Sequence, residues 1–132
     1  MPVLDASVVV ELLAFGKYCE VAENRILASE SALWAPELLD AEVGSALRGA
    51  VRRRAGDAAR AGEALEELRR LPIHRVSHER LAQFAWLVRD NVSFYDGLYV
   101  ALAQLLGQPL LTFDARLARS GVDAEIEILA QA

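Results

Sequence analysis

Short apolar runs alternate with longer amphipathic stretches along the chain. The runs have the length and composition of buried strands, and the stretches between them repeat apolar residues at helical spacing. Strands that alternate with helices indicate a parallel sheet, because parallel neighbours need a long crossover connection. We therefore expect a three-layer α/β/α sandwich with a central parallel sheet. Strands are expected at 2–5, 33–36, 72–76, 109–113 and 126–129, and helices at 6–15, 17–30, 36–54, 57–71, 77–91, 94–107 and 115–121.

Local signals support several of these boundaries. Asp57 and Ser77 precede amphipathic stretches and are typical N-cap residues. Gly107 follows a long apolar helical pattern and is expected to end that helix. Pro36 suits the first turn of a helix or the residue just before it.

Length and composition limit the class of protein. The 132 residues fit one domain spanning 1–132, and 54% hydrophobic with 25% charged residues excludes a disordered chain. The net charge of −5 argues against nonspecific binding of nucleic acid by the whole surface. Cys19 is the single cysteine, which fits a reducing compartment. No apolar run approaches a membrane span and no signal peptide stands out, so we expect a cytoplasmic protein with no membrane association.

Two aspartates follow predicted strands in the same way. Asp5 interrupts the apolar N-terminal run, and Asp114 comes directly after the fourth predicted strand. Ligands gather at the carboxyl ends of parallel strands, so these side chains are candidates for a shared site. The alternative for each is a helix N-cap, which aspartate also favours.

The predicted helices supply further acids. Helical spacing places Asp96 on an apolar face near the start of its helix, where a carboxylate is favoured by the helix dipole. Ordinary capping is the alternative for this residue. In the stretch PELLDAEVGSALRGAV, Asp40 and Glu42 lie on opposite edges of an apolar stripe, and periodicity does not choose between them. We place that stripe at Leu39, Val43, Ala46 and Ala50.

The segments VLDASVVVELL, PELLDAEVGSAL, FYDGLYVALA and LLTFDARLA, taken together and in this order, resemble bacterial PIN-domain proteins of the VapC toxin type. The resemblance spans nearly the whole chain. It implies that Asp5, Asp96 and Asp114 hold a divalent metal and that Glu42, rather than Asp40, completes the site or positions the attacking water. It also implies that the four acids are catalytic, and that Ser7 and Thr112 lie near the metal or the scissile phosphate. For the two hydroxyls, capping and strand propensity are the alternatives.

The chemistry agrees with that resemblance. Oxygen ligands without a nitrogen or sulfur cluster favour Mg²⁺, with Mn²⁺ as the alternative. Two carboxylates about 5 Å apart repel by roughly 3 kcal/mol at an effective dielectric of about 20, so four together need a cation or a proton. The resemblance further implies an endoribonuclease toxin of a type II toxin–antitoxin pair. It would cleave structured RNA, often transfer RNA, pair with a VapB-like antitoxin and form a homodimer.

Rival functions are a receiver-type phosphoacceptor, a non-catalytic PIN-like scaffold and a PIN nuclease of RNA processing. A receiver needs an acidic pair after its first strand and a lysine after a late strand. This chain has one acid there, and its only lysine is Lys17. The presence of all four acids argues against the scaffold.

Other residues are interpreted structurally. His74 and His78 straddle a strand-to-helix junction, so we expect surface side chains rather than a metal pair. A basic run is interpreted as a solvated helix end, with contact to an RNA backbone as the alternative; it contains Arg48, Arg52, Arg53 and Arg54. Five aromatic residues are interpreted as core or dimer contacts: Phe84, Trp86, Phe94, Tyr95 and Tyr99.

Overall fold

The structure is a computed structural model and describes residues 1–14, 16–53 and 56–130. The strands are β1 (Val3–Leu4), β2 (Leu33–Pro36), β3 (Ile73–Val76), β4 (Leu110–Thr112) and β5 (Ile126–Ile128). The helices are α1 (Ala6–Leu13), α2 (Cys19–Ser29), α3 (Leu38–Arg52), α4 (Ala58–Arg70), α5 (His78–Leu87), α6 (Phe94–Leu106) and α7 (Ala115–Ala118). Each predicted strand and helix is present, with ends that differ by a few residues.

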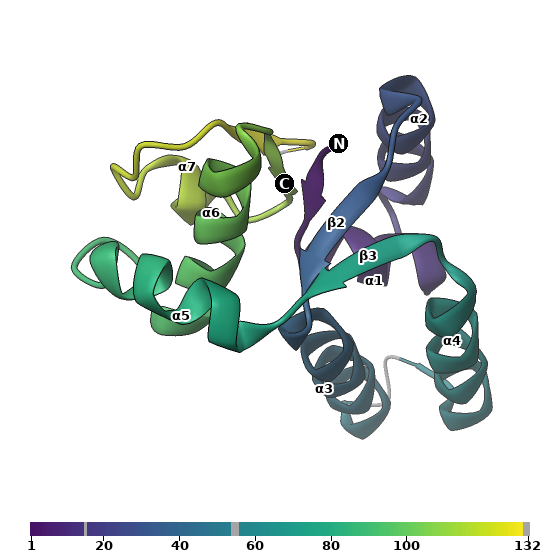
Figure 1. The fold of residues 1–132 in the computed structure, drawn as a ribbon. Coiled ribbons are helices and arrows are strands. Elements are labelled where there is room, and N and C mark those ends of the chain that lie inside the picture. Colours follow the sequence, from purple (N-terminus) through teal and green to yellow (C-terminus); the bar gives the residue numbers. More distant parts are fainter. Residues whose placement is uncertain (15, 54–55, 131–132) are drawn as a thin grey trace.

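All the pairings in the sheet are parallel, and the strand order is β3-β2-β1-β4-β5. Helices α1 to α4 pack in one hydrophobic cluster and α5 to α7 in another, one on each face of the sheet (Figure 1). The predicted three-layer sandwich is confirmed.

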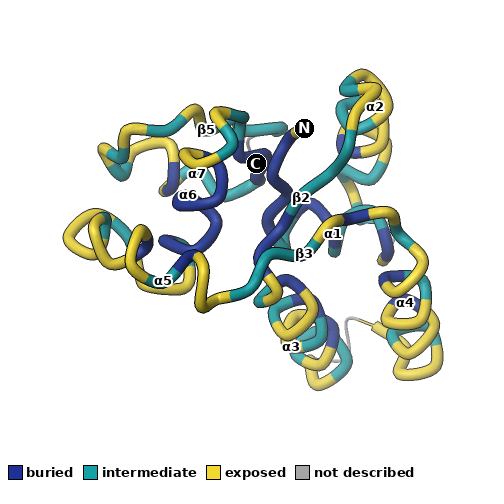
Figure 2. Tube along the Cα trace, in the orientation of Figure 1, coloured by how far each residue is buried: buried dark blue, intermediate teal, exposed yellow. Residues whose placement is uncertain are grey.

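Neighbouring residues of the central strands serve the two clusters in turn. In β1, Val3 packs with α5 to α7 and Leu4 packs with α1 to α4. Leu110 and Leu111 of β4 divide in the same way. Side chains of a strand alternate between its faces, and a sheet covered on both faces needs apolar residues at every position. The short apolar runs of the sequence follow from this, and the buried centre is visible in Figure 2.

Helix α6 passes through the core. Its residues from Gly97 to Ala103 are all buried. A Cβ atom at Gly97 would lie 3.1 Å from the backbone oxygen of Ala85 in α5, so the glycine permits a close crossing of the two helices. Ser93 caps the start of α6 and Gly107 ends it in the left-handed conformation. This packing holds Asp96, in the first turn, against the rest of the molecule.

Several local predictions can be checked directly. Asp57 and Ser77 are N-caps as predicted, and each accepts a hydrogen bond from a backbone N–H of its helix. Pro36 is the last residue of β2 rather than part of α3. The buried residues of α3 are Leu39, Val43 and Leu47, so the predicted stripe was wrong at Ala46, which is exposed. No helix in the described part of the chain is long and apolar enough to cross a membrane.

Candidate functional site

The strand order places the ends of β1 and β4 at a special point of the sheet. From β1 the chain continues to β2 on one side, and from β4 it continues to β5 on the other. Ligands of open parallel sheets bind where the order reverses in this way, beyond the carboxyl ends of the strands. Asp5 follows β1 and Asp114 follows β4, so the topology brings both predicted residues to that point. Both are also N-caps, so the capping interpretation is confirmed, and their part in a shared site stays a prediction.

The Asp5 carboxylate is only 9% exposed and is surrounded by donors. Ser7 Oγ donates to Oδ1 at 2.5 Å, the backbone N–H of Val8 donates to the same atom at 3.3 Å, and Thr112 Oγ1 donates to Oδ2. Burial raises the pKa of this carboxyl from 3.8 to about 6, because loss of water outweighs the hydrogen bonds, which lower it. At neutral pH the group is therefore mostly ionised although it is buried.

Ser7 and Thr112 are fixed by more than Asp5. Ser7 Oγ accepts the backbone N–H of Phe113 at 3.0 Å, and Thr112 Oγ1 accepts that of Asp114 at 2.9 Å. Each hydroxyl therefore uses its proton on Asp5 and a lone pair on the turn after β4. In this structure both side chains orient Asp5 and the turn that carries Asp114. Their predicted proximity to a scissile phosphate stays a prediction.

The two acids of α3 have different surroundings. Asp40 is exposed and forms a bidentate ion pair with Arg75 of β3, at 3.0 and 2.8 Å. Glu42 is half-buried, and its pKa is raised by burial and further by the charge of Asp96. The ion pair with β3 gives Asp40 a structural role, whereas Glu42 is the acid of α3 that is coupled electrostatically to Asp96.

Tyr99 of α6 joins this group, which the sequence analysis did not anticipate. Its hydroxyl is buried and, among the described residues, forms no hydrogen bond of good geometry. It lies close enough to Glu42 to lower the pKa of that carboxyl. Burial raises the pKa of the phenol, and Glu42 and the charges of Asp5 and Asp96 raise it further. A buried hydroxyl on which three of the acids act therefore lies in the electrostatic field of the acidic group. An apolar stripe alone contains no signal for this role.

Asp96 and Asp114 are the second pair of neighbouring acids. Burial raises the pKa of Asp96, and the charge of Asp114 raises it further, while the Ser93 hydroxyl opposes the shift. Both carboxylates line one hollow of the surface, whereas Ser7 and Glu42 line another. Asp96 is linked electrostatically to Glu42 and Asp114, and Tyr99 links it to Asp5.

Asp114 has a cationic partner of its own. The Arg116 guanidinium donates to Oδ1 at 3.1 Å and to Oδ2 at 2.8 Å, and the backbone N–H of Arg116 donates to Oδ1 at 2.9 Å. These contacts lower the pKa of the Asp114 carboxyl. The pairing was not predicted from the sequence.

The donor set fits a hard divalent cation. The acidic group offers carboxylate oxygens and the buried hydroxyl of Tyr99. The pKa values of the Glu42 and Asp96 carboxyl groups are raised by burial and by neighbouring charge. No three histidine, cysteine or acidic side chains form a ready-made metal cage within the part of the chain that the structure describes. Mg²⁺ keeps several of its water ligands and needs only one or two direct carboxylates, so an open group of acids suits it.

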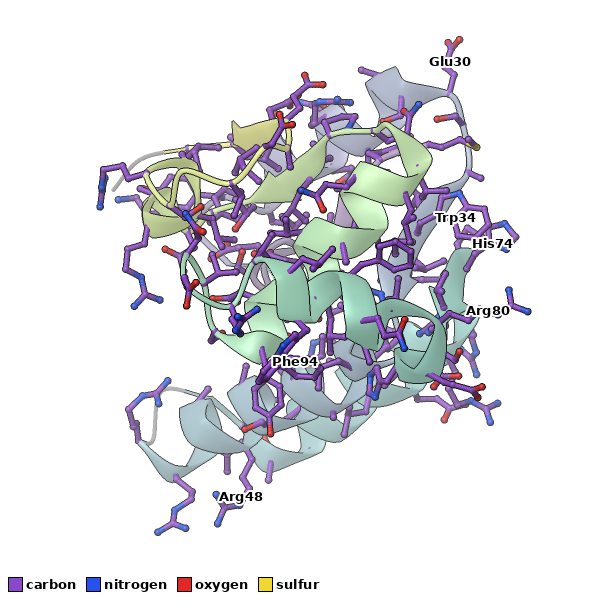
Figure 3. The ribbon with its side chains drawn as sticks, turned by 60° about the vertical axis from the view of Figure 1, so that its left-hand side comes forward. Glu30, Trp34, Arg48, His74, Arg80 and Phe94 are labelled. Carbon is purple, nitrogen blue, oxygen red and sulfur yellow. The ribbon has the colours of Figure 1, made fainter. Side chains whose placement is uncertain are left out.

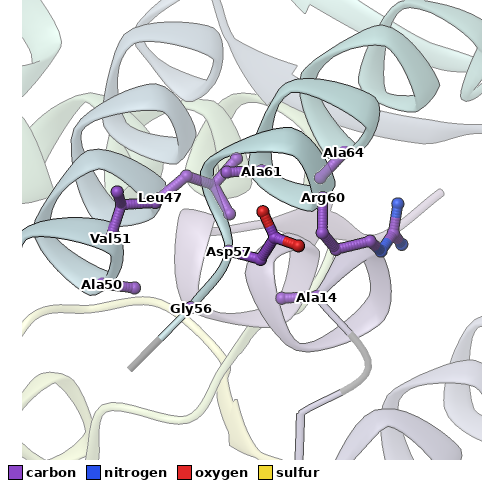
Figure 4. A pocket seen from close by; sticks show the side chains of 9 residues that line it. All are labelled: Ala14, Leu47, Ala50, Val51, Gly56, Asp57, Arg60, Ala61 and Ala64. Atoms are coloured by element: carbon purple, nitrogen blue, oxygen red, sulfur yellow. The ribbon is translucent and has the colours of Figure 1, made fainter. Parts of the chain in front are cut away.

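Other candidates lie outside the acidic group. His74 stacks on Trp34 with ring centroids 4.7 Å apart, as a surface side chain of β3 (Figure 3). Arg48 points away from α3 in the same view, Arg52 and Arg53 are exposed, and Arg54 lies outside the described residues. An apolar hollow between α3 and α4 has Leu47 and Ala64 in its wall and none of the four acids (Figure 4).

The remaining aromatic predictions divide between core and surface. Tyr99 is buried, whereas the other four side chains are 41% to 63% exposed: Phe84, Trp86, Phe94 and Tyr95.

Comparison with known proteins gives consistent results. Residues 3–122 match the PIN domain family. Ribonuclease VapC1 of Mycobacterium tuberculosis is 47% identical over 129 residues, which cover 96% of each chain. Ribonuclease VapC3 of the same organism is 43% identical over 119 residues, covering 89% of this chain and 85% of that protein.

Two solved structures share the fold. The sarcin–ricin loop cleaving toxin VapC20 of M. tuberculosis aligns with a TM-score of 0.68 at 24% identity, over 95% of this chain and 99% of that chain. A toxin–antitoxin complex from Klebsiella pneumoniae aligns with a TM-score of 0.69 at 17% identity, over 100% of both chains.

Proposed function

The chain belongs to the VapC family of PIN-domain ribonucleases, and on this premise we propose that it is a Mg²⁺-dependent endoribonuclease, the toxin of a type II toxin–antitoxin pair. The observation that supports the proposal is the topology, in which Asp5 follows β1 and Asp114 follows β4 at the point where the strand order reverses, together with the electrostatic coupling of Asp96 to Glu42 and to Asp114. The substrate is RNA, and Mn²⁺ is an alternative cation.

In this proposal Asp5, Asp96 and Asp114 hold the cation, and Glu42 completes the site or positions the attacking water. When bound, the cation supplies a water of lowered pKa and neutralises charge on the phosphodiester. Ser7 and Thr112 keep both oxygens of Asp5 in place, so the ligand has little freedom to turn. The buried hydroxyl of Tyr99 lies beside Glu42 and would offer that carboxylate a donor.

The proposal also includes a VapB-like antitoxin and a homodimer. Several curated and structural relatives are named as VapC ribonucleases or as toxin–antitoxin complexes, which supports an antitoxin partner. The outer face of α5 exposes Phe84, Trp86 and Leu87, the last by 74%. Adjacent exposed apolar side chains favour a protein contact, and a second copy is the occupant we propose. Leu87→Glu should then shift the mass measured by light scattering from dimer to monomer.

Cleavage of RNA with and without metal is the main test. The purified protein should cut RNA in Mg²⁺, lose the activity in EDTA and regain it when Mg²⁺ or Mn²⁺ is added. Asp5→Asn should abolish cleavage with the fold retained in circular dichroism. Asp57→Asn is the matched control, because Asp57 is likewise an N-cap aspartate but lies exposed at the start of α4. Full activity of Asp5→Asn, or activity in EDTA free of contaminating nuclease, would contradict the metal mechanism. Binding of antitoxin without cleavage would favour a scaffold.

A further inference from the structure

Arg116 occupies the atoms of Asp114 that a cation would need. Its guanidinium contacts both carboxylate oxygens, at 3.1 and 2.8 Å, and its backbone N–H takes a further lone pair of Oδ1. The negative charge of Asp96 acts on the same guanidinium. A positive group therefore already sits where the two acids of this hollow meet.

The ion pair between Arg116 and Asp114 contributes little to the stability of the fold. The side chain of Arg116 is 82% exposed and that of Asp114 is 28% exposed. Ion pairs this accessible to water contribute little to folding, because water and salt replace them at small cost. By contrast, Arg75 is 22% exposed in its pair with Asp40 and also donates to the backbone oxygen of Ile73. Arg116 makes no contact of this second kind in the described part of the chain, so it is free to leave Asp114.

A cation held by Asp114 would weaken the ion pair of that carboxylate with the guanidinium of Arg116. A carboxylate oxygen directed at a metal ion has less negative charge to offer Arg116, and the two positive groups repel each other. Arg116 belongs to the lining of the hollow that also contains Asp96 and Ser93. The released side chain remains attached two residues from Asp114, in that hollow, with five N–H donors and no partner of its own.

We propose that Arg116 alternates between two partners, Asp114 in the free protein and a phosphodiester group of the RNA once a cation is bound. The inference rests on the proposed function and assigns to it a substrate-binding residue. The planar fork of a guanidinium matches two phosphate oxygens as well as it matches a carboxylate, so the same geometry serves both states. In the free protein the pairing keeps the site partly neutralised and competes with the cation.

Opposite changes in metal and RNA binding are the expected signature. Arg116→Gln should bind Mn²⁺ about two- to fivefold more tightly in the absence of RNA, because the competing ion pair is gone. The same variant should bind a fluorescent single-stranded oligoribonucleotide about tenfold more weakly in Ca²⁺, with a salt slope smaller by about 0.7. Arg116→Lys should recover the salt slope but not the full affinity, since it keeps the charge and loses the fork.

Arg119→Gln is the matched control. Arg119 is exposed and its charge reaches Asp114, yet it donates no hydrogen bond to that carboxylate in the described residues. It should change both affinities less than Arg116→Gln does. Equal effects of the two variants would reduce Arg116 to a general contribution of charge. Weaker binding of both Mn²⁺ and RNA by Arg116→Gln, or no change in the binding of either, would overturn the proposal. A parent protein that binds neither Mn²⁺ nor RNA would instead refute the proposed function, and this inference with it.

Discussion

The buried carboxylate of Asp5 should make the stability of the metal-free protein depend on pH in a predictable direction. Its pKa is about 6 in the folded protein, against 3.8 ordinarily, so the folded state binds more protons than the unfolded state between these values. A carboxyl group with a raised pKa supports folding fully below pH 3.8, and this support is lost as pH rises through about 6. Asp5→Asn removes the titration.

The magnitude follows from the same difference. At 1.36 kcal/mol per pKa unit, ionising Asp5 in the folded state costs about 3 kcal/mol at neutral pH. About 1.4 kcal/mol of this change falls between pH 5 and pH 8, where most other carboxylates no longer titrate. The free energy of unfolding of Asp5→Asn, minus that of the parent, should therefore rise by about 1.4 kcal/mol across this range. The prediction concerns how this difference changes with pH and not its absolute value. The amide of the variant also places an N–H₂ group opposite Ser7 or Thr112, which changes the stability of the variant by the same amount at every pH.

Urea unfolding in EDTA, followed by circular dichroism at several pH values, measures this slope. Asp57→Asn replaces an N-cap aspartate that nothing buries, and it should not reproduce the trend. A difference between Asp5→Asn and the parent that stays constant from pH 5 to pH 8 would refute the argument. It would mean that water or structural relaxation relieves the buried charge.

Further predictions concern the surroundings of this carboxylate. Asp96→Asn should raise the melting temperature in EDTA near neutral pH, with a gain in stability of about 1 kcal/mol, because the half-buried charge and its repulsion by Asp114 are removed. The variant should also lose the stabilisation that Mg²⁺ gives the parent. A destabilised variant with an intact Mg²⁺ response would place Asp96 outside the site. Replacing Arg52 and Arg53 together by glutamine should leave the RNA affinity and its salt slope unchanged in filter-binding titrations, if the two arginines only complete a solvated helix end. A salt slope lower by about 0.7 per residue would instead assign them to the RNA interface. Gly97→Ala should lower the stability measured in thermal melts by about 1–3 kcal/mol, since its Cβ atom would lie 3.1 Å from the backbone oxygen of Ala85. Gly62→Ala should stabilise α4, because a Cβ atom there meets nothing within 4 Å. Equal effects of the two variants would contradict the close crossing of α5 and α6.

The positions of two acidic residues could be predicted from the local sequence pattern. An aspartate that ends an apolar run must leave the core or find partners, so Asp5 was recognisable at once, and the position of Asp114 after β4 followed the same rule. The alternation of strands and helices implied a parallel sheet, and the carboxyl ends of a parallel sheet share one edge. These inferences need only residue type and spacing, because burial of apolar surface imposes them on any chain of this pattern.

The different surroundings of Asp40 and Glu42 became visible only in the tertiary structure. Both lie beside the same apolar stripe of α3, and periodicity records only which side of a helix faces the core. Arg75 of β3 forms an ion pair with Asp40, and α6 brings Asp96 and the hydroxyl of Tyr99 toward Glu42. These partners are distant in sequence, so no local signal encodes the difference.

The sequence was sufficient for the strands, the helices and most caps, since each depends on neighbours within a few residues. The raised pKa of Asp5, the role of Tyr99 and the crossing at Gly97 depend on groups that only folding brings together. Burial and electrostatic coupling are properties of three-dimensional distance, and the chain specifies those distances through the packing of both faces of the sheet rather than through any one segment.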